Sequence, residues 1–466
     1  MIQENQYKSE VKNNAVLLRC AYPYGKSQLW MPTDLYKVGA KLEATGIKTD
    51  VVDLNLEEIP SNIGDYDYVG IGVIGAPYIP GTIRLANEVR ERTGKNPLIG
   101  GPGVEYLSEE QFRTLYGNAT QIRNDKDLST AINRQIPSVY NVSIADRMNR
   151  LNPALLERYL SGEFSFFVSQ GCKYACDFCA ASRSRQGMRV NEEYSKTIEK
   201  DLGALIRKSN ELGIKKVTMY LTPLDLFQSP ASFKETLRDF AAAKQAYGTD
   251  FSLRGLSRVD SFLNALKQEP ELYDLIPTVG LQAVGFGVDG TTEEVWKSQH
   301  KGNKSLSKVD GAFAICKTLS ITPEALMVMG FHDKKGLPVD TKDSLQKNVD
   351  FSITSAEQYG VVARPHVAKD LVPGNSGWEN PVWSIQRSQL LAKPELFKNL
   401  DFVALASEIT HPNPEFRDQV NETYLQIVRQ LTPKGLCATT PLLSYTGNPK
   451  QDRIADTFNM LVPFDK

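Results

Sequence analysis

The sequence predicts an α/β protein with two successive parallel sheets, a doubly wound sheet followed by a partial (β/α)6 barrel, and a helical C-terminal extension. Three observations predict this. Short apolar strands alternate with helical stretches, which is the rhythm of a parallel sheet. The alternation weakens once and then resumes for six further units. With 466 residues, the chain is long enough for two or three domains.

The first third of the chain predicts the doubly wound sheet. Four buried-type strands alternate with helices, at Ala15–Cys20, Lys48–Leu54, Tyr68–Ile74 and Pro97–Ile99. The fourth strand runs directly into Gly100-Gly101-Pro102-Gly103. Ligands of such sheets bind beyond the carboxyl ends of the strands, so we expect a binding edge at this glycine turn.

The second alternation predicts the barrel. A polar connector precedes it, and the strand signal fades after Pro373-Gly374. We therefore expect four parts: a doubly wound domain at 1–130, a linker at 131–163, a barrel at 164–375 and a helical domain at 376–466. The six expected barrel strands are Phe164–Ser169, Lys216–Leu221, Asp250–Gly255, Ala283–Val288, Ala325–Gly330 and Gly360–Ala368. The active face of such a barrel lies at the carboxyl ends of its strands.

Composition and charge narrow the class of protein. Lys plus Arg (54) nearly balance Asp plus Glu (55), which argues against a nucleic-acid partner because phosphate binding normally requires a basic excess. The longest uncharged stretch, Tyr68–Ile83, contains prolines and glycines and falls short of the roughly 20 apolar residues of a membrane helix. The N-terminus lacks the apolar core of a signal peptide. We expect a cytoplasmic protein with no membrane contact.

The six cysteines are unevenly spread. Three crowd between positions 172 and 179, whereas a disulfide framework would distribute them in pairs. Cys316 lies on a helical apolar stripe and is expected in the core. Cys437 follows Gly435 in a C-terminal turn and could line a substrate pocket.

The most informative segment is the cysteine loop that follows the first barrel strand. Cys172, Cys176 and Cys179 have CxxxCxxC spacing, with aromatic Phe178 before the last cysteine. Iron–sulfur clusters are held by thiolates, and three local thiolates leave one iron of a 4Fe-4S cluster open. The alternatives are chance clustering or a zinc site, but structural zinc needs four ligands and none of the four histidines lies near the loop.

This loop, with a (β/α) barrel of TIM type behind it, resembles the radical S-adenosylmethionine (SAM) superfamily. The resemblance covers about 210 residues, Phe164 to Gly374. It implies that the open iron binds SAM and that an electron from the cluster cleaves it to methionine and a 5′-deoxyadenosyl radical. The protein then binds and orients the cofactors and the substrate and shields the radical, while the cofactors perform the bond breaking.

The same resemblance implies which residues contact SAM. They are Phe178 in the cysteine loop, Arg258 after the third barrel strand, Asp289 after the fourth and Met329 at the fifth. Asp289 stands where glutamate is usual, so its carboxylate reaches one methylene less far. The alternative for Arg258 is a solvated or salt-bridged arginine, and for Asp289 a loop carboxylate that caps the next helix.

Residues 13 to about 130 resemble the Rossmann-like cobalamin-binding domain that precedes the barrel in one radical SAM class. The resemblance implies cobalamin contacts at Tyr22, Gly72, Gly100, Gly101 and Pro102, where glycine lets backbone pass close to a bulky ligand. Two departures stand out: the loop after the first strand has no histidine, and the usual acidic turn is replaced by residues 123–127. The alternative is a doubly wound domain that holds no cofactor or a different ligand.

The resulting hypothesis is a cobalamin-dependent radical SAM enzyme that methylates an unactivated carbon of a small-molecule or peptide substrate. It would need an electron donor such as flavodoxin or ferredoxin. One alternative is a cyclisation or rearrangement with the same cofactors but without methyl transfer. A methylthiotransferase would carry three more cysteines in its N-terminal domain, where this chain has only Cys20. A non-catalytic cobalamin or iron–sulfur sensor or carrier is the alternative from a different class.

Overall fold

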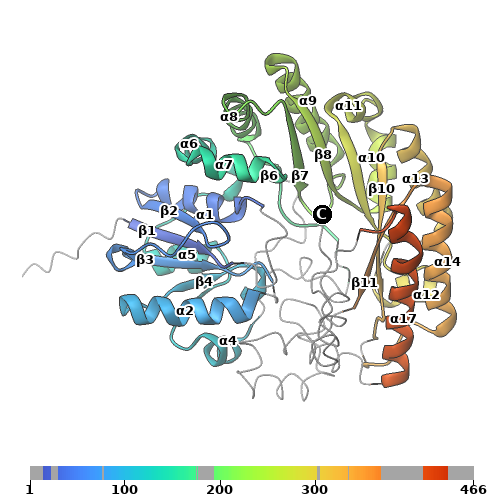
Figure 1. Ribbon diagram of the computed structural model, residues 1–466, viewed down its shortest axis with the longest axis horizontal. Helices are drawn as coiled ribbons and strands as arrows, with labels where there is room; N and C mark the ends of the chain where they lie inside the picture. Colours follow the sequence, from blue (N-terminus) through green and yellow to red (C-terminus); the bar gives the residue numbers. More distant parts are fainter. Residues whose placement is uncertain are drawn as a thin grey trace, which may run out of the picture.

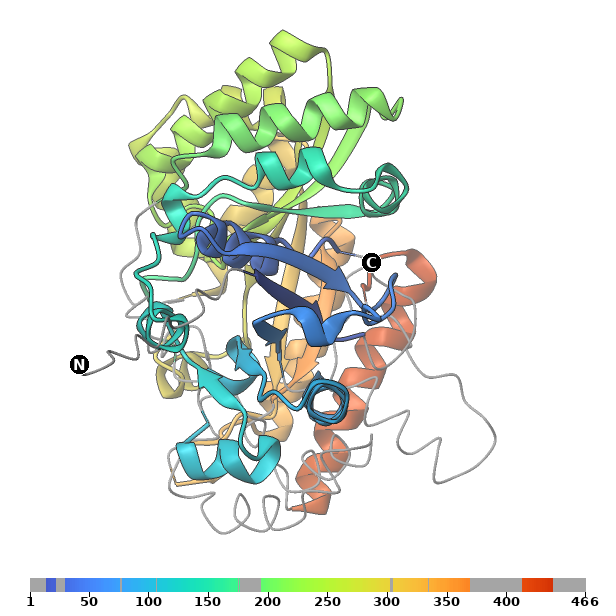
Figure 2. The same ribbon diagram turned by 90° about the vertical axis from the view of Figure 1, so that its left-hand side faces the viewer.

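The structure, a computed structural model, describes residues 14–21, 30–75, 78–105, 107–174, 176, 194–301, 305–333, 335–368 and 413–438. Two parallel sheets lie side by side, each with helices packed against it (Figure 1). Seen from the side of the N-terminal domain, the smaller sheet lies in front of the barrel strands (Figure 2). The α/β fold expected from the sequence is confirmed.

The N-terminal sheet has five parallel strands in the order β2-β1-β3-β4-β5. Its central strands are apolar and buried on both faces, which is why the sequence shows them as continuous hydrophobic runs. The fifth strand is the polar segment Thr-Gln-Ile, which the sequence did not predict. The strands are β1 (Asn14–Arg19), β2 (Lys48–Asp53), β3 (Tyr68–Gly72), β4 (Leu98–Gly100) and β5 (Thr120–Ile122).

Helices cover both faces of this sheet. They are α1 (Thr33–Glu43), η1 (Ile63–Asp65), α2 (Ile79–Thr93), α3 (Pro102–Glu105), α4 (Glu109–Tyr116) and α5 (Asp125–Ile132). Their starts have local causes: Ser108 and Gln111 form a capping box for α4, and Asn124 caps α5.

The barrel domain has six parallel strands in sequence order, and all six predicted strands are present. They are β6 (Glu163–Phe167), β7 (Lys216–Thr222), β8 (Asp250–Ser257), β9 (Leu281–Gly287), β10 (Thr322–Met329) and β11 (Val362–Val367). The surrounding helices are α8 (Ile198–Glu211), α9 (Pro230–Tyr247), α10 (Val259–Gln268), α11 (Leu272–Val279), α12 (Glu293–Ser298), α13 (Leu306–Thr318) and α14 (Lys342–Tyr359).

Alternation along the barrel strands separates an apolar outer layer from a charged inner layer. Leu253 and Ala325 point outward into the helix-packed core, whereas their neighbours Arg254 and Glu324 point into the barrel. Arg254 bonds Glu163 at 2.8 Å and Glu324 at 3.3 Å, two strands away on either side. Such contacts require a curved sheet, so this ion network fixes the curvature of the open barrel.

Both open edges of the barrel are covered in the described part of the chain. At β11, Ala363 donates its N–H to Leu436 O at 2.9 Å and accepts from Ala438 N–H at 3.0 Å. Helix α17 (Pro414–Leu431), followed by η9 (Thr432–Lys434), packs against β11 and α14 through an apolar cluster. At β6, Thr33 Oγ1 of the N-terminal domain donates to Ser165 O at 2.6 Å.

The segment expected as a polar linker contains η3 (Val139–Asn141), α6 (Ala145–Arg150) and α7 (Pro153–Leu160). Its apolar side chains Met148, Leu156 and Tyr159 are fully buried and belong to the barrel's core cluster. The segment is therefore packed structure between the two sheets, although the domain boundaries stay a prediction.

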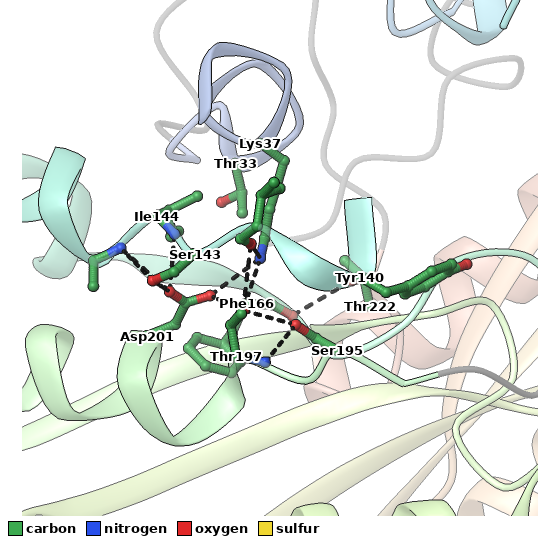
Figure 3. A network of polar contacts seen from close by, with 12 residues as sticks. Thr33, Lys37, Tyr140, Ser143, Ile144, Phe166, Ser195, Thr197, Asp201 and Thr222 are labelled. Atoms are coloured by element: carbon green, nitrogen blue, oxygen red, sulfur yellow. Dashed lines mark hydrogen bonds and ion pairs between the residues drawn. The ribbon is translucent and has the colours of Figure 1, made fainter. Parts of the chain in front are cut away.

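A buried ion pair joins the two domains (Figure 3). Lys37 of α1 donates to Asp201 of α8 at 3.1 Å, to Val142 O at 2.6 Å and to Thr197 Oγ1 at 3.4 Å. Burial lowers the pKa of Lys37, and the Asp201 carboxylate opposes that shift. Asp201 also accepts the backbone N–H groups of Ile144 and Ala145 at the start of α6. One carboxylate therefore fixes three segments of chain at the interface.

Candidate iron–sulfur site and cofactor edge

The cysteine loop begins where strand β6 ends, at the carboxyl edge of the barrel. Ser169 donates its N–H to Thr222 O at 3.2 Å, and Gly171 then turns the chain with a φ of +85°. Cys172 is half-buried and Cys176 is buried. Cys179 and Phe178 lie outside the described residues. The two described thiols therefore occupy the edge where barrel enzymes place their chemistry.

A buried glutamine anchors the loop from the neighbouring β7–α9 connection. Gln228 accepts the N–H of Lys173 through its side chain at 3.0 Å and the Lys173 ammonium through its carbonyl at 2.6 Å. Gln228 is 1% exposed and Lys173 is half-buried, so these contacts are partly shielded from water. The backbone next to Cys172 is therefore held by the β7–α9 connection of the barrel.

Arg258 contacts the second cysteine directly. Its Nη1 donates to Cys176 Sγ at 3.2 Å, and both residues are 8% exposed. The guanidinium carbon lies 3.9 Å from the centre of the Tyr174 ring, which places the cation over the ring face. Nε of Arg258 is buried without a hydrogen-bond partner among the described residues.

This contact is the test of whether the residues fit an iron–sulfur cluster. A ligating thiolate is anionic, and a guanidinium is the matched donor for an anionic acceptor. The free Nε leaves a second donor at the same place for a further acceptor. The described part of the donor set, two thiols at a strand end with a fixed cation beside them, fits a thiolate-ligated cluster.

Asp225 organises the polar groups behind Arg258. Its carboxylate accepts Ser257 Oγ at 3.1 Å, Ser261 Oγ at 2.6 Å and the Arg258 N–H at 3.4 Å. Burial raises the pKa of Asp225, while these hydrogen bonds, that of Ser261 first, oppose the shift. Ser261 also bonds the Tyr174 hydroxyl at 3.0 Å. A continuous chain of contacts thus runs from Asp225 to the cysteine loop.

Sequence reasoning missed Tyr174, Asp225, Gln228 and Ser261. A signal existed for Asp225 and Gln228, because polar residues that directly follow parallel strands gather at one edge of the sheet. Tyr174 and Ser261 lie 87 positions apart, and no local pattern connects them.

The other predicted SAM contacts are differently placed. Asp289 has a φ of +48° and forms a buried ion pair with Lys301. The Met329 side chain is fully buried in the apolar cluster with α14 and α17, and its carbonyl accepts the Ala368 N–H at 2.7 Å. The described contacts bring Arg258, and neither of these two, to the cysteine loop. SAM contacts at Asp289 and Met329 stay predictions.

The glycines assigned to cobalamin lie at the carboxyl edge of the N-terminal sheet, where α3 begins at Pro102. A Cβ on Gly72 would lie 2.9 Å from Leu35, one on Gly100 3.0 Å from Ile122 O, and one on Gly101 2.7 Å from Val73 O. Backbone packing thus already requires glycine at 101, where φ is +110°, and leaves little room for a side chain at 100, whereas the contact at 72 is with the flexible end of Leu35. They do not by themselves show a cofactor cradle, and cobalamin contacts there stay predictions. Tyr22 lies outside the described residues.

The carboxyl edge of the N-terminal sheet faces the barrel interior. Trp30 stacks on Tyr220 of β7, with ring centres 6.1 Å apart and planes 4° from parallel. Arg19 at the end of β1 donates to Trp30 O and bonds Asp53 at 3.3 Å, and Asp53 also accepts the Tyr159 hydroxyl at 2.8 Å. The two edges therefore meet directly, so groups bound at each would lie in one shared region.

The two parallel sheets meet at their carboxyl edges, and the cysteine loop lies at this edge of the barrel. This arrangement defines a class of fold. This chain has the fold of cobalamin-dependent radical SAM enzymes. It is similar to the radical SAM methyltransferase TsrM from Kitasatospora setae, solved with cobalamin and a [4Fe-4S] cluster, at 15% identity and a TM-score of 0.58 over 78% of this chain and 77% of TsrM. A second TsrM structure, with tryptophan substrate and the SAM analogue aza-SAM, gives 16% identity and a TM-score of 0.59 over 81% and 76%.

It is also similar to the cobalamin-dependent SAM radical enzyme OxsB, solved with aqua-cobalamin and SAM. Identity is 13% and the TM-score 0.54 over 91% of this chain and 61% of OxsB. No protein-family model matches the sequence. No curated protein sequence matches it either.

No helix in the described ranges has the length and apolar character to cross a membrane.

Proposed function

We propose that this chain is a cobalamin-dependent radical SAM enzyme that methylates an unactivated carbon of a small-molecule or peptide substrate. The observation that carries the proposal is the position of Cys172 and Cys176 at the end of β6, opposite the carboxyl edge of the N-terminal sheet. The proposal includes contacts to SAM by Phe178, Arg258, Asp289 and Met329. It also includes contacts to cobalamin by Tyr22, Gly72, Gly100, Gly101 and Pro102.

When bound, the cluster would supply the electron that splits SAM into methionine and a 5′-deoxyadenosyl radical, and cobalamin would supply the methyl group. The chain's own residues would bind these cofactors and shield the radical. Gln228 and Asp225 fix the cysteine loop and Arg258, while Trp30 stacks on Tyr220 where the two domains meet. Contact between the domains matters because a carbon radical must be protected from water and side reactions.

The first experiment tests the cofactors. Protein purified without oxygen is reconstituted with iron, sulfide and hydroxocobalamin, then incubated with dithionite and methyl-labelled SAM. We expect about four irons per chain, formation of 5′-deoxyadenosine and label on cobalamin. Cys176→Ala should lose the cluster and 5′-deoxyadenosine formation. The matched control, Cys316→Ala, removes a thiol buried in α13 and should keep both.

The second experiment tests methyl transfer. Tryptophan, the substrate in one TsrM structure, and a tryptophan-containing peptide are the first probes. Label in the probe supports a methyltransferase. Conversion of the probe with label confined to methionine would assign the chain to cyclisation or rearrangement. Absence of 5′-deoxyadenosine from a cluster-loaded protein, with the probe neither labelled nor converted, would instead indicate a sensor or carrier and overturn the proposal.

A further inference from the structure

In the contact between Arg258 and Cys176, the guanidinium touches the sulfur of a proposed cluster ligand. Its Nη1–Sγ distance is 3.2 Å, and both side chains are almost excluded from water. Electrostatic interactions are strong in such an environment because little water is present to screen them. The charge of Arg258 therefore acts directly on whatever Cys176 ligates.

The position of the guanidinium is fixed by groups on both sides. Its backbone lies at the start of α10, where Asp225 accepts the N–H. Its charged plane rests on the Tyr174 ring, and the hydroxyl of that ring is tied to Ser261. Asp225 also accepts Ser261 Oγ. One carboxylate therefore positions both the backbone of Arg258 and, through Ser261, the Tyr174 ring on which the guanidinium rests.

We propose, as an extension of the proposed function, that Arg258 is a positioning residue whose hydrogen bond to Cys176 raises the reduction potential of the cluster. A one-electron protein donor of the flavodoxin or ferredoxin class reduces the cluster from the 2+ to the 1+ state, and no bond to the protein changes. The reduced cluster carries one more negative charge, so a fixed adjacent cation stabilises it more than the oxidised cluster.

This role differs from binding SAM, and the structure allows the two to be separated. Nη1 of Arg258 is engaged with sulfur, whereas Nε is buried without a partner among the described residues. If Nη1 acts on the cluster, the effect is present without SAM. If the arginine serves only SAM, its loss changes nothing until SAM is added.

The test is a redox titration of the reconstituted full-length enzyme without SAM, followed by electron paramagnetic resonance of the reduced cluster. Arg258→Gln should shift the ratio of reduced to oxidised cluster at least about tenfold at a fixed potential, equal to about 59 mV more negative for a one-electron couple. Arg258→Lys keeps the charge but loses the planar fork, and we expect a smaller shift in the same direction.

Lys173→Gln is the matched control. It removes a positive charge one residue from Cys172, but the described contacts of this ammonium are to Gln228 O and the Tyr174 ring. We expect a shift of less than about threefold, corresponding to less than about 30 mV. An equal shift in both variants would mean that any nearby charge suffices and would overturn the proposal.

Two further outcomes are decisive. Unchanged potentials in both Arg258 variants, with loss of the spectral change on adding SAM, would assign Arg258 to SAM alone and overturn the inference while leaving the proposed function intact. A wild-type protein without a reducible 4Fe-4S signal would overturn the proposed function itself. If Arg258→Gln does not retain iron, the Arg258→Lys potential decides.

Discussion

Two buried polar clusters in this molecule differ in whether their hydrogen bonds are completed within the protein. At the domain interface, Lys37 uses all three N–H donors on Asp201, Val142 O and Thr197 (Figure 3). At the cysteine loop, Arg258 reaches Cys176 but leaves Nε buried and without a partner among the described residues. We call the first the closed cluster, because every N–H donor of Lys37 has a partner within the protein. We call the second the open cluster, because Arg258 keeps a donor available where the cofactors are proposed to bind.

This difference separates stability from function. A buried charge with every donor satisfied stabilises one arrangement of the chain, and removing one partner leaves the other charge uncompensated. A buried donor without a partner costs free energy in the protein alone, unless a ligand supplies the acceptor. We therefore expect substitutions in the closed cluster to lower stability and those in the open cluster to change the properties of the bound cofactor.

The largest expected effect on stability is at Lys37. Lys37→Met should lower the free energy of unfolding by about 3–5 kcal/mol, because it leaves the Asp201 carboxylate buried without its cation. Urea unfolding of anaerobically purified protein measures this. The control is Lys200→Met on α8, the helix that carries Asp201: its partner Asp146 is 75% exposed, so the cost should be below about 1 kcal/mol. Equal costs would show that the interface pair is not special.

Most of the fold was predictable because strands β1, β3 and β6 to β11 combine apolar patterning with regular spacing. Strand β5 was missed because its three residues are mostly polar and take their conformation from pairing with β4. The helices α6 and α7 were missed because Met148, Leu156 and Tyr159 stand among charged residues, and only contact with the barrel buries them.

The site was predictable only in part. The cysteines have a local pattern, but Lys37 and Asp201 are 164 positions apart and Arg258 and Cys176 are 82 apart. Such pairs depend on how strands are ordered in the sheet, which no short window of sequence contains. The glycines at 100 and 101 show the opposite problem: their pattern suggested a ligand, whereas close approach to the backbone oxygens of Ile122 and Val73 already accounts for small residues there.

A second prediction concerns how the two buried thiols outside the cysteine loop make stability depend on pH. Burial raises the pKa of Cys20 to about 11 and that of Cys316 to about 12. Since the folded state holds these protons more tightly than the unfolded state, stability should fall as pH rises above 9, by up to about 1.4 kcal/mol per pH unit for each thiol. Cys316→Ala should reduce this slope in unfolding experiments between pH 9 and 10. A slope identical to that of the wild type would contradict the burial argument.

The difference in burial between Cys172 and the thiols Cys20 and Cys316 predicts the order in which the cysteines react with an alkylating reagent. In metal-free native protein at pH 8, iodoacetamide should modify Cys172, which is half-buried, while Cys20 and Cys316 stay unmodified until unfolding. Peptide mass analysis checks this. Early labelling of Cys316 would contradict its placement in the barrel core.

The smallest expected effect is at Tyr174, where a single hydroxyl joins the open cluster to α10. Tyr174→Phe keeps the ring beneath Arg258 and removes the hydrogen bond to Ser261, worth about 1 kcal/mol. An iron chelator should therefore remove the cluster about fivefold faster, the factor that 1 kcal/mol represents. Ser261→Ala should act similarly but more strongly, since it also removes a donor to Asp225. In the double variant, the Tyr174 effect should disappear, because its partner is already absent. Additive effects would mean that the two residues hold the loop independently, and the chain of contacts from Asp225 to the cysteines would not act as a unit.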